Sequence, residues 1–220
     1  MFFLPFTFLI FILFILFLPV LFLLGYFHIV VVGFETLGIS PQLTLLILYS
    51  ILIGSLVNIP LTKKKLVLVE ESRFFGLFSK PKIESQYIAI NLGGGIIPVL
   101  LSFYFLFIVK SQGFELKPIF TAIILMALVS KFFSRIVPGK GVVVSAFIPP
   151  IFSALFALIL APGFVAPCAF IAGVLGTLIG ADLLNITRIK NYRGYLSIGG
   201  AGVFDGILLT GIISALLAGF

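Results

Sequence analysis

Two aspartates, Asp182 and Asp205, are the residues of this 220-residue sequence best suited to chemistry. They are the only aspartates in the chain, and each lies in a run of apolar and small residues typical of a membrane span. Ionisable groups at membrane depth are costly, so they mark functional sites by default. Two carboxyl groups held together can share a proton: one is the base for a water molecule, while its protonated partner polarises a carbonyl. The pair therefore predicts acid–base catalysis or the binding of a proton or cation.

Three functions fit these two residues. The first is an intramembrane aspartic endopeptidase that cuts a transmembrane helical peptide. The second is a proton- or cation-coupled membrane transporter with the same aspartates as its ion site. The third is a non-catalytic membrane partner protein in which the aspartates pair with Lys or Arg. The distance between the carboxyl groups separates the first two, because a shared proton needs near-contact whereas an ion site can spread its ligands over several helices.

The sequence contains no pattern of metal or cofactor ligands that would indicate another kind of site. The single Cys168 and the single His28 form no cluster of Cys and His, and no phosphate-binding loop or nucleophile elbow is present. The formal net charge of +7 would suit nucleic acid, but basic residues on the cytoplasmic loops of a membrane protein account for it. We therefore expect no metal, no cofactor and no nucleic-acid partner. Membrane lipid and a transmembrane peptide substrate are the expected partners.

The composition is that of an integral membrane protein. Hydrophobic residues make up 61% of the chain, charged residues 10%, and the mean hydropathy is +1.35. Soluble domains carry roughly 45–50% apolar and about 25% charged residues. Because a spanning helix needs about 20 apolar residues, the sequence predicts an all-α, polytopic transmembrane helix bundle of about seven spans in one membrane domain, 1-220. The predicted spans are 2-24, 41-61, 87-109, 118-133, 142-160, 166-186 and 195-218.

The basic residues predict an orientation for this bundle. Twelve of the fourteen Lys and Arg lie in or beside the loops that follow the second, fourth and sixth spans. The positive-inside rule then places the N-terminus in the cytoplasm and the C-terminus outside. We expect a prokaryotic plasma membrane location, with the connection between Asp182 and Asp205 on the cytoplasmic side.

The longest polar segment, 62-86, is predicted to be a basic cytoplasmic loop held at anionic headgroups. Its partly alternating sequence, KKKLVLVEESRFFGLF, leaves open a short strand pair or an amphipathic element. The segment 25-40, which carries His28 and Glu35, is also predicted to be a loop.

Glycine and proline interrupt the third and fifth predicted spans. Backbone groups freed by such breaks survive at membrane depth only within protein or beside a water-filled cavity. We therefore predict that the broken segments line the site, with close helix packing through glycine as the alternative. The residues concerned are Asn91, Gly93, Gly94, Gly95, Pro149 and Pro150.

The two aspartates are expected at matching depth. Asp182 lies five residues before Thr187, at the end of its span, and Asp205 seven residues after Ile198. At 1.5 Å per residue both are roughly 8–10 Å deep. Gly202 and Gly206 belong to a small-residue stripe that leaves access beside Asp205. A second stripe, Ala172, Gly176 and Gly180, is expected to serve packing.

Two motifs resemble known families. Gly180–Asn185 (GADLLN) and Gly199–Gly206 (GGAGVFDG) resemble an uncharacterised family of archaeal and bacterial membrane proteins of about this length. More distantly, the arrangement resembles the presenilin and signal-peptide-peptidase class of intramembrane aspartic proteases, which place one aspartate on each of two adjacent helices. That resemblance implies that Asp182 and Asp205 are the catalytic pair. Asn185, within the first motif, is a further candidate cavity-lining residue.

The chain departs from the presenilin class in two respects. That class has its second aspartate in a Gly-x-Gly-Asp motif, whereas here two residues separate Gly202 from Asp205. It also carries a Pro-Ala-Leu motif on a later helix, and no proline follows Asp205 in this sequence.

Overall fold

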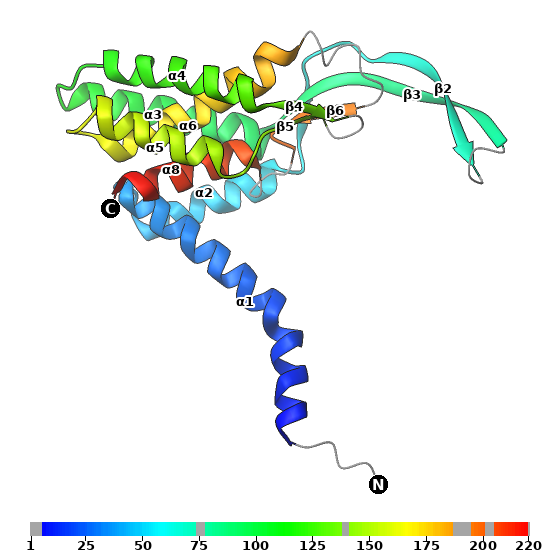
Figure 1. Ribbon diagram of the computed structural model, residues 1–220, viewed down its shortest axis with the longest axis horizontal. Coiled ribbons are helices and arrows are strands. Elements are labelled where there is room, and N and C mark those ends of the chain that lie inside the picture. The colour runs from blue at the N-terminus through cyan, green and yellow to red at the C-terminus, as the bar shows by residue number, and fades with distance from the viewer. Residues whose placement is uncertain (1–5, 74–77, 138–140, 187–194, 201–204, 220) are drawn as a thin grey trace.

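The computed structural model describes residues 6–73, 78–137, 141–186, 195–200 and 205–219. The described chain is mostly helical, with a small number of strands at one end of the helices (Figure 1). The α-helices are α1 (Phe6–Thr36), α2 (Pro41–Gly54), α3 (Ile97–Ser111), α4 (Lys117–Phe133), α5 (Ile148–Leu160), α6 (Val165–Thr177) and α8 (Gly206–Gly219). The shorter helical turns are η1 (Leu92–Ile96), η2 (Leu178–Asp182) and η3 (Leu183–Asn185). The strands are β1 (Asn58–Pro60), β2 (Lys65–Arg73), β3 (Phe78–Asn91), β4 (Arg135–Val137), β5 (Gly141–Val143) and β6 (Tyr195–Ile198).

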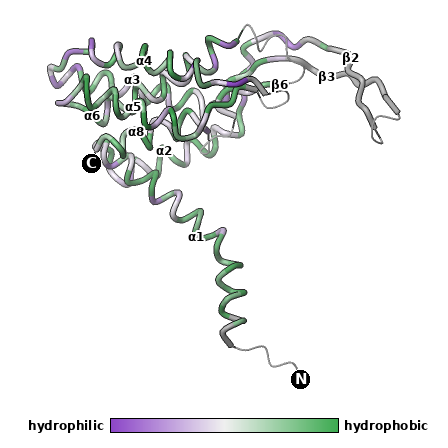
Figure 2. The backbone as a smooth tube through the Cα atoms, in the orientation of Figure 1, coloured by the Kyte–Doolittle hydropathy of each residue, from purple (hydrophilic) through white to green (hydrophobic). Residues whose placement is uncertain are grey.

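Within the residues that the structure describes, three stretches are helical, long and apolar enough to cross a membrane: Ile10–Thr36, Leu92–Ser111 and Val165–Asn185. Three further helices, α2, α5 and α8, are apolar but shorter. Hydrophobic residues dominate the helices throughout (Figure 2). The protein is therefore an integral membrane protein with a helical architecture, as the composition predicts.

Helix α6 forms the centre of the bundle. It packs against α3, α4, α5 and α8, and most of its residues are buried. Phe170 on α6 contacts two other buried rings, Phe105 at 5.2 Å and Phe34 at 6.5 Å between centroids. Glycines of α6 and of the following turn η2 allow this close packing, because a side chain at Gly176 or Gly180 would overlap α4. The expectation that this glycine stripe serves packing is thus confirmed for both glycines.

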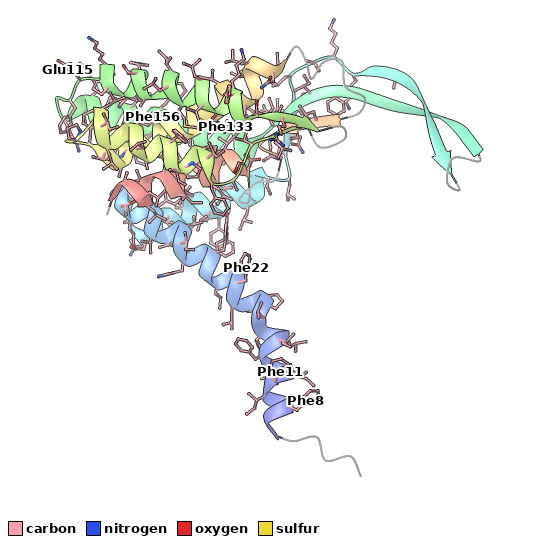
Figure 3. The ribbon with its side chains drawn as sticks, in the orientation of Figure 1. Phe8, Phe11, Phe22, Glu115, Phe133 and Phe156 are labelled. Atoms are coloured by element: carbon pink, nitrogen blue, oxygen red, sulfur yellow. The ribbon has the colours of Figure 1, made fainter. Side chains whose placement is uncertain are left out.

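Helix α1 is longer than predicted and runs to Thr36, so the loop prediction for 25-40 is wrong for residues 25–36 and holds only for 37–40. The residues after Leu24 are mostly apolar, and Val30 and Phe34 are buried in the core. This burial stabilises the helical conformation of the segment, although His28 and Glu35, considered alone, would favour a loop. The first half of α1 projects from the bundle, and Phe8, Phe11 and Phe22 on α1 are exposed (Figure 3).

The loop predicted over 62-86 is instead largely a strand pair, the alternative that its alternating sequence left open. β2 and β3 pair in antiparallel register from Lys65↔Gln86 to Arg73↔Phe78 and extend away from the helices (Figure 1). β3 then continues toward the bundle, where it pairs with β1 on one side and with β6, in parallel, on the other. The sheet therefore connects the extended strands to the segment before Asp205.

Glycine and proline act differently from each other at the interrupted spans. Residues Gly93, Gly94 and Gly95 are buried in the π-helical turn η1, so the predicted departure from regular α-helix is confirmed there. Pro149 and Pro150 lie in the first turn of α5, which begins at Ile148. The predicted break at these prolines is wrong, because the first turn of a helix needs no N–H donor and accepts proline without a kink.

Candidate functional site

Asp182 and Asp205 line one cavity of about 460 Å³. Its wall is formed by the end of α6 with η2, the segment before α5, strand β6 with Gly199 and Gly200, and the first turns of α8. Two residues that lie 23 positions apart in the sequence are therefore part of the same cavity wall.

Asp182 occupies a helix that changes geometry just before it. Regular α-helix ends at Thr177, the π turn η2 ends at Asp182, and the 3₁₀ turn η3 follows directly. Single π turns are rare inside helices and are frequently found at functional sites. Here the turn re-aims the last residues of the helix and carries the Asp182 side chain to the cavity.

Asp205 precedes α8 and caps it, so its predicted place seven residues inside a helix is wrong. Its Oδ1 atom accepts a hydrogen bond from the Ile207 N–H at 2.9 Å, and its backbone carbonyl accepts one from the Leu209 N–H at 3.0 Å. Aspartate is among the preferred N-cap residues, and a negative charge is favoured at a helix N-terminus. The cap therefore fixes the position of the Asp205 carboxyl group at the N-terminus of α8.

Hydroxyl groups that the sequence reasoning missed also line the cavity: Ser145, Thr177, Ser197 and Thr210. Thr210 Oγ1 donates to the Gly206 carbonyl at 2.6 Å, and Ser197 Oγ donates to Asn58 Oδ1 at 2.6 Å. The Thr177 hydroxyl is buried and has no hydrogen-bond partner in the described part of the chain. The cavity thus combines two carboxyl groups with several neutral oxygen atoms.

Among the other predicted lining residues, Gly206 and Pro149 do line the cavity. A side chain at Gly206 would meet no atom within 4 Å, so the glycine leaves open space beside Asp205, as predicted. Pro150 is buried beside Pro149 but is not part of the wall. Gly202 lies outside the described residues.

Asn185 faces away from the aspartates. Its side-chain amide donates to the Ala181 carbonyl at 2.8 Å and to Ser134 Oγ at 3.0 Å. It lines a separate, more open groove beside the end of α4. Its role in the structure is to tie the end of the Asp182 helix to the segment after α4.

Asn91 and the three glycines lie behind the cavity wall instead of lining it. The Asn91 side chain is fully buried, and its Oδ1 accepts hydrogen bonds from the N–H groups of Gly93 and Gly94, both at 3.0 Å. Its Nδ2 donates to the Ser55 carbonyl at 2.8 Å and to Asn58 Oδ1 at 3.1 Å. Asn91 therefore satisfies the backbone N–H groups of the π turn. The sequence predicts these backbone groups beside a water-filled site.

Gly199 lies between the glycine tract of η1 and the cavity. Its φ of +71° is in the left-handed region, and a side chain on it would overlap the backbone of Gly94 and Gly95. The glycine tract thus packs directly against the wall that Gly199 forms. The alternative of close packing through glycine is the one that the structure shows.

We predict that Asn91→Ala lowers the free energy of unfolding by about 2 kcal/mol, because it leaves buried N–H and carbonyl groups without partners. Asn91→Asp should also destabilise the protein, since it keeps the acceptor for the two glycine N–H groups but turns an oxygen toward the Ser55 carbonyl. Thermal unfolding in detergent compares the variants with wild type. An unchanged midpoint for both would contradict the supporting role of Asn91.

Strand β6 gives the cavity an extended backbone in its wall. Leu196, Ser197 and Ile198 line the cavity, and in the described part of the chain β6 pairs with β3 alone. Edge strands present unpaired N–H and carbonyl groups that can bind an extended peptide.

A model of the family described as "Protein of unknown function (DUF1614)" matches residues 52–217. No curated protein and no solved structure matches the chain. The resemblance to the presenilin class therefore has no support from these comparisons. Because the family match covers more than half of the sequence and includes both aspartates, the chain belongs to the DUF1614 family of proteins of unknown function.

Proposed function

We propose that this protein is an intramembrane aspartic endopeptidase with Asp182 and Asp205 as its catalytic pair. The observation that supports the proposal is that two carboxyl groups from different elements line one cavity. Aspartic protease chemistry needs this arrangement, because each carboxyl group must reach the reacting atoms directly or through one water molecule.

The cap on Asp205 supports a division of roles between the two aspartates. Asp205, held as a carboxylate at the N-terminus of α8, accepts a proton from water, and the water oxygen attacks the scissile carbonyl carbon. Asp182 donates its proton to the carbonyl oxygen, which gives a tetrahedral diol. The carbon–nitrogen bond then breaks as Asp205 passes its proton to the amine nitrogen and Asp182 recovers one from a diol hydroxyl. Both carboxyl groups return to their starting states.

The proposed substrate is a transmembrane helical peptide that unwinds locally. The peptide bond of a helix is shielded by its own hydrogen bonds, so the cleaved segment must be extended. The edge of β6 lies in the same wall as the aspartates and offers backbone partners to such a segment. Substrate binding by strand addition would thus place a peptide bond beside the carboxyl pair.

In this proposal the chain is a single membrane domain of the prokaryotic plasma membrane, with its N-terminus in the cytoplasm. The orientation rests on the basic residues, which gather in and beside alternate loops. We predict that a reporter fused after Phe220 is extracytoplasmic and that one inserted near Ser72 is cytoplasmic. Reporter activity on the same side of the membrane for both fusions would contradict the seven-span orientation.

A proton- or cation-coupled transporter is the second candidate. The feature that favours it is the interruption of the Asp182 helix by a π turn beside an unsatisfied Thr177 hydroxyl. Transporters commonly build substrate and ion sites from discontinuous helices near the middle of the membrane. In this candidate function the carboxyl and hydroxyl oxygens would bind the ion, with no peptide bond involved.

Purified protein in vesicles separates the two candidates. Vesicles that also carry a tagged transmembrane peptide should yield two fragments whose new termini, identified by mass spectrometry, lie within the spanning segment. The same vesicles, loaded with a pH-sensitive dye or with radioactive sodium, report ion flux. Cleavage without flux supports the endopeptidase, whereas flux without cleavage of several unrelated transmembrane peptides would replace it with the transporter.

A further inference from the structure

Thr177 carries a buried hydroxyl group whose hydrogen bonds no described neighbour satisfies. Three such hydroxyl groups occur in the described part of the chain, on Thr44, Ser130 and Thr177. Thr177 is 5% exposed, and of the three residues it alone is in the wall of the aspartate cavity. Burying a polar group without a partner costs free energy, so we expect a bound molecule to form hydrogen bonds with the hydroxyl at this position.

The helix geometry directs this hydroxyl to the same space as Asp182. Thr177 is the last residue of α6, and the π turn from Leu178 to Asp182 follows it. In regular α-helix, residues five apart point about 140° away from each other, but a π turn pairs residues i and i+5. The turn therefore brings Thr177 and Asp182 to the same side of the helix, where both line the cavity.

We propose that the Thr177 hydroxyl holds a water molecule together with the carboxyl groups of Asp182 and Asp205. That this water is the nucleophile rests on the proposed endopeptidase function; that it binds does not. A buried water typically makes about three hydrogen bonds, and a hydroxyl can both donate to it and accept from it. The cavity, at about 460 Å³, is far larger than the roughly 30 Å³ share of one water.

Thr210 does not compete for this role. Its hydroxyl lines the same cavity but already donates its proton to the Gly206 carbonyl at 2.6 Å. The hydroxyl of Thr177 keeps both its donor and its acceptor capacity for the bound water.

The test compares Thr177→Val, which keeps the shape of the side chain, with Thr177→Ser, which keeps the hydroxyl. For cleavage of the tagged peptide, Thr177→Val should lower kcat about 10- to 100-fold with KM within about twofold of wild type, because the lost group orients the water and not the peptide. Thr177→Ser should recover at least about a third of the wild-type kcat. The thermal midpoint of Thr177→Val should stay near that of wild type, since valine keeps the shape of the side chain.

Thr44→Val is the matched control. Thr44 is also fully buried, and its hydroxyl has no hydrogen-bond partner among the described residues, but it is not part of the cavity wall. Its valine variant should likewise keep the thermal midpoint near that of wild type and should leave kcat unchanged. A Thr177→Val kcat within twofold of wild type, or a Thr177→Ser variant as impaired as the valine variant, overturns the role of the hydroxyl in cleavage.

An experimental structure that shows ordered water tests the site even if wild type cleaves no peptide. Density should lie about 2.6–3.2 Å from Thr177 Oγ1 and within hydrogen-bond reach of both carboxyl groups, and should disappear in Thr177→Val. An empty position in wild type, or density that persists in Thr177→Val, overturns the proposal. Density that appears only with added sodium, at the shorter distances of a metal ion, replaces the water with a cation and favours the transporter.

Discussion

Asp182→Asn and Asp205→Asn are each expected to lower cleavage of a transmembrane reporter about 10²- to 10⁴-fold, the range attributed to a positioned acid or base. Asparagine keeps the shape of the side chain but cannot exchange the proton that each step of the proposed reaction moves. The two groups act as one unit, so the double variant should be about as inactive as either single variant. The measurement is the initial rate of fragment formation by wild type and the three variants in the same vesicles.

Position 205 offers a control that separates chemistry from folding. Asparagine caps a helix about as well as aspartate, so Asp205→Asn should keep α8 and the thermal midpoint near that of wild type. Asp205→Ala loses the side-chain acceptor for the Ile207 N–H and should cost about 1 kcal/mol of stability in addition to activity. Equal cleavage by wild type and both asparagine variants would exclude the aspartates as the catalytic pair.

The site could be predicted in part from the sequence because its chemistry depends on rare residues. Two aspartates in an otherwise apolar background can be identified from the sequence alone, and both line the cavity. Gly206 could be predicted for the same kind of reason, since a glycine beside Asp205 leaves open space in any local geometry. These inferences need only residue type and proximity in the sequence.

The part of the site that could not be predicted depends on exceptions to regular helix. Thr177 lies five residues before Asp182, a spacing that points away from it at 100° per residue. The π turn instead brings Thr177 and Asp182 to the same side of the helix. No residue in Leu178–Asp182 favours such a turn by its own propensity. Hydropathy predicts Asp205 inside a helix, because hydropathy does not distinguish a strand followed by a helix cap from a continuous span.

The same limitation explains the errors in the fold. Hydropathy predicts which segments are buried in lipid or protein, and the core position of α6 follows from its uniformly small and apolar sequence. Where helices begin and end is decided by tertiary contacts, such as the packing of Val30 and Phe34 that extends α1. The pairing of β3 with β1, β2 and β6 brings together segments far apart in the sequence, which local patterns alone do not encode.

Gly93→Ala is expected to lower the free energy of unfolding by at least about 3 kcal/mol, at the upper end of the cost of overpacking. A Cβ atom at this position would overlap the Ile51 carbonyl oxygen and lie 2.7 Å from the Ser55 N atom. Both are backbone atoms, so no side chain can rotate to make room, and α2 must move away from η1. Thermal or denaturant unfolding in detergent measures the loss.

Gly25→Ala is the matched control for this prediction. Gly25 is within helix α1, and a Cβ atom there would meet no atom within 4 Å. Alanine in a helix interior is favoured over glycine by about 0.5–1 kcal/mol, so this variant should be as stable as wild type or slightly more so. Equal unfolding midpoints for the two variants would contradict the close approach of α2 and η1. Because Gly94 and Gly95 also support Gly199 in the cavity wall, displacement of η1 should reduce cleavage even in the fraction of Gly93→Ala protein that remains folded.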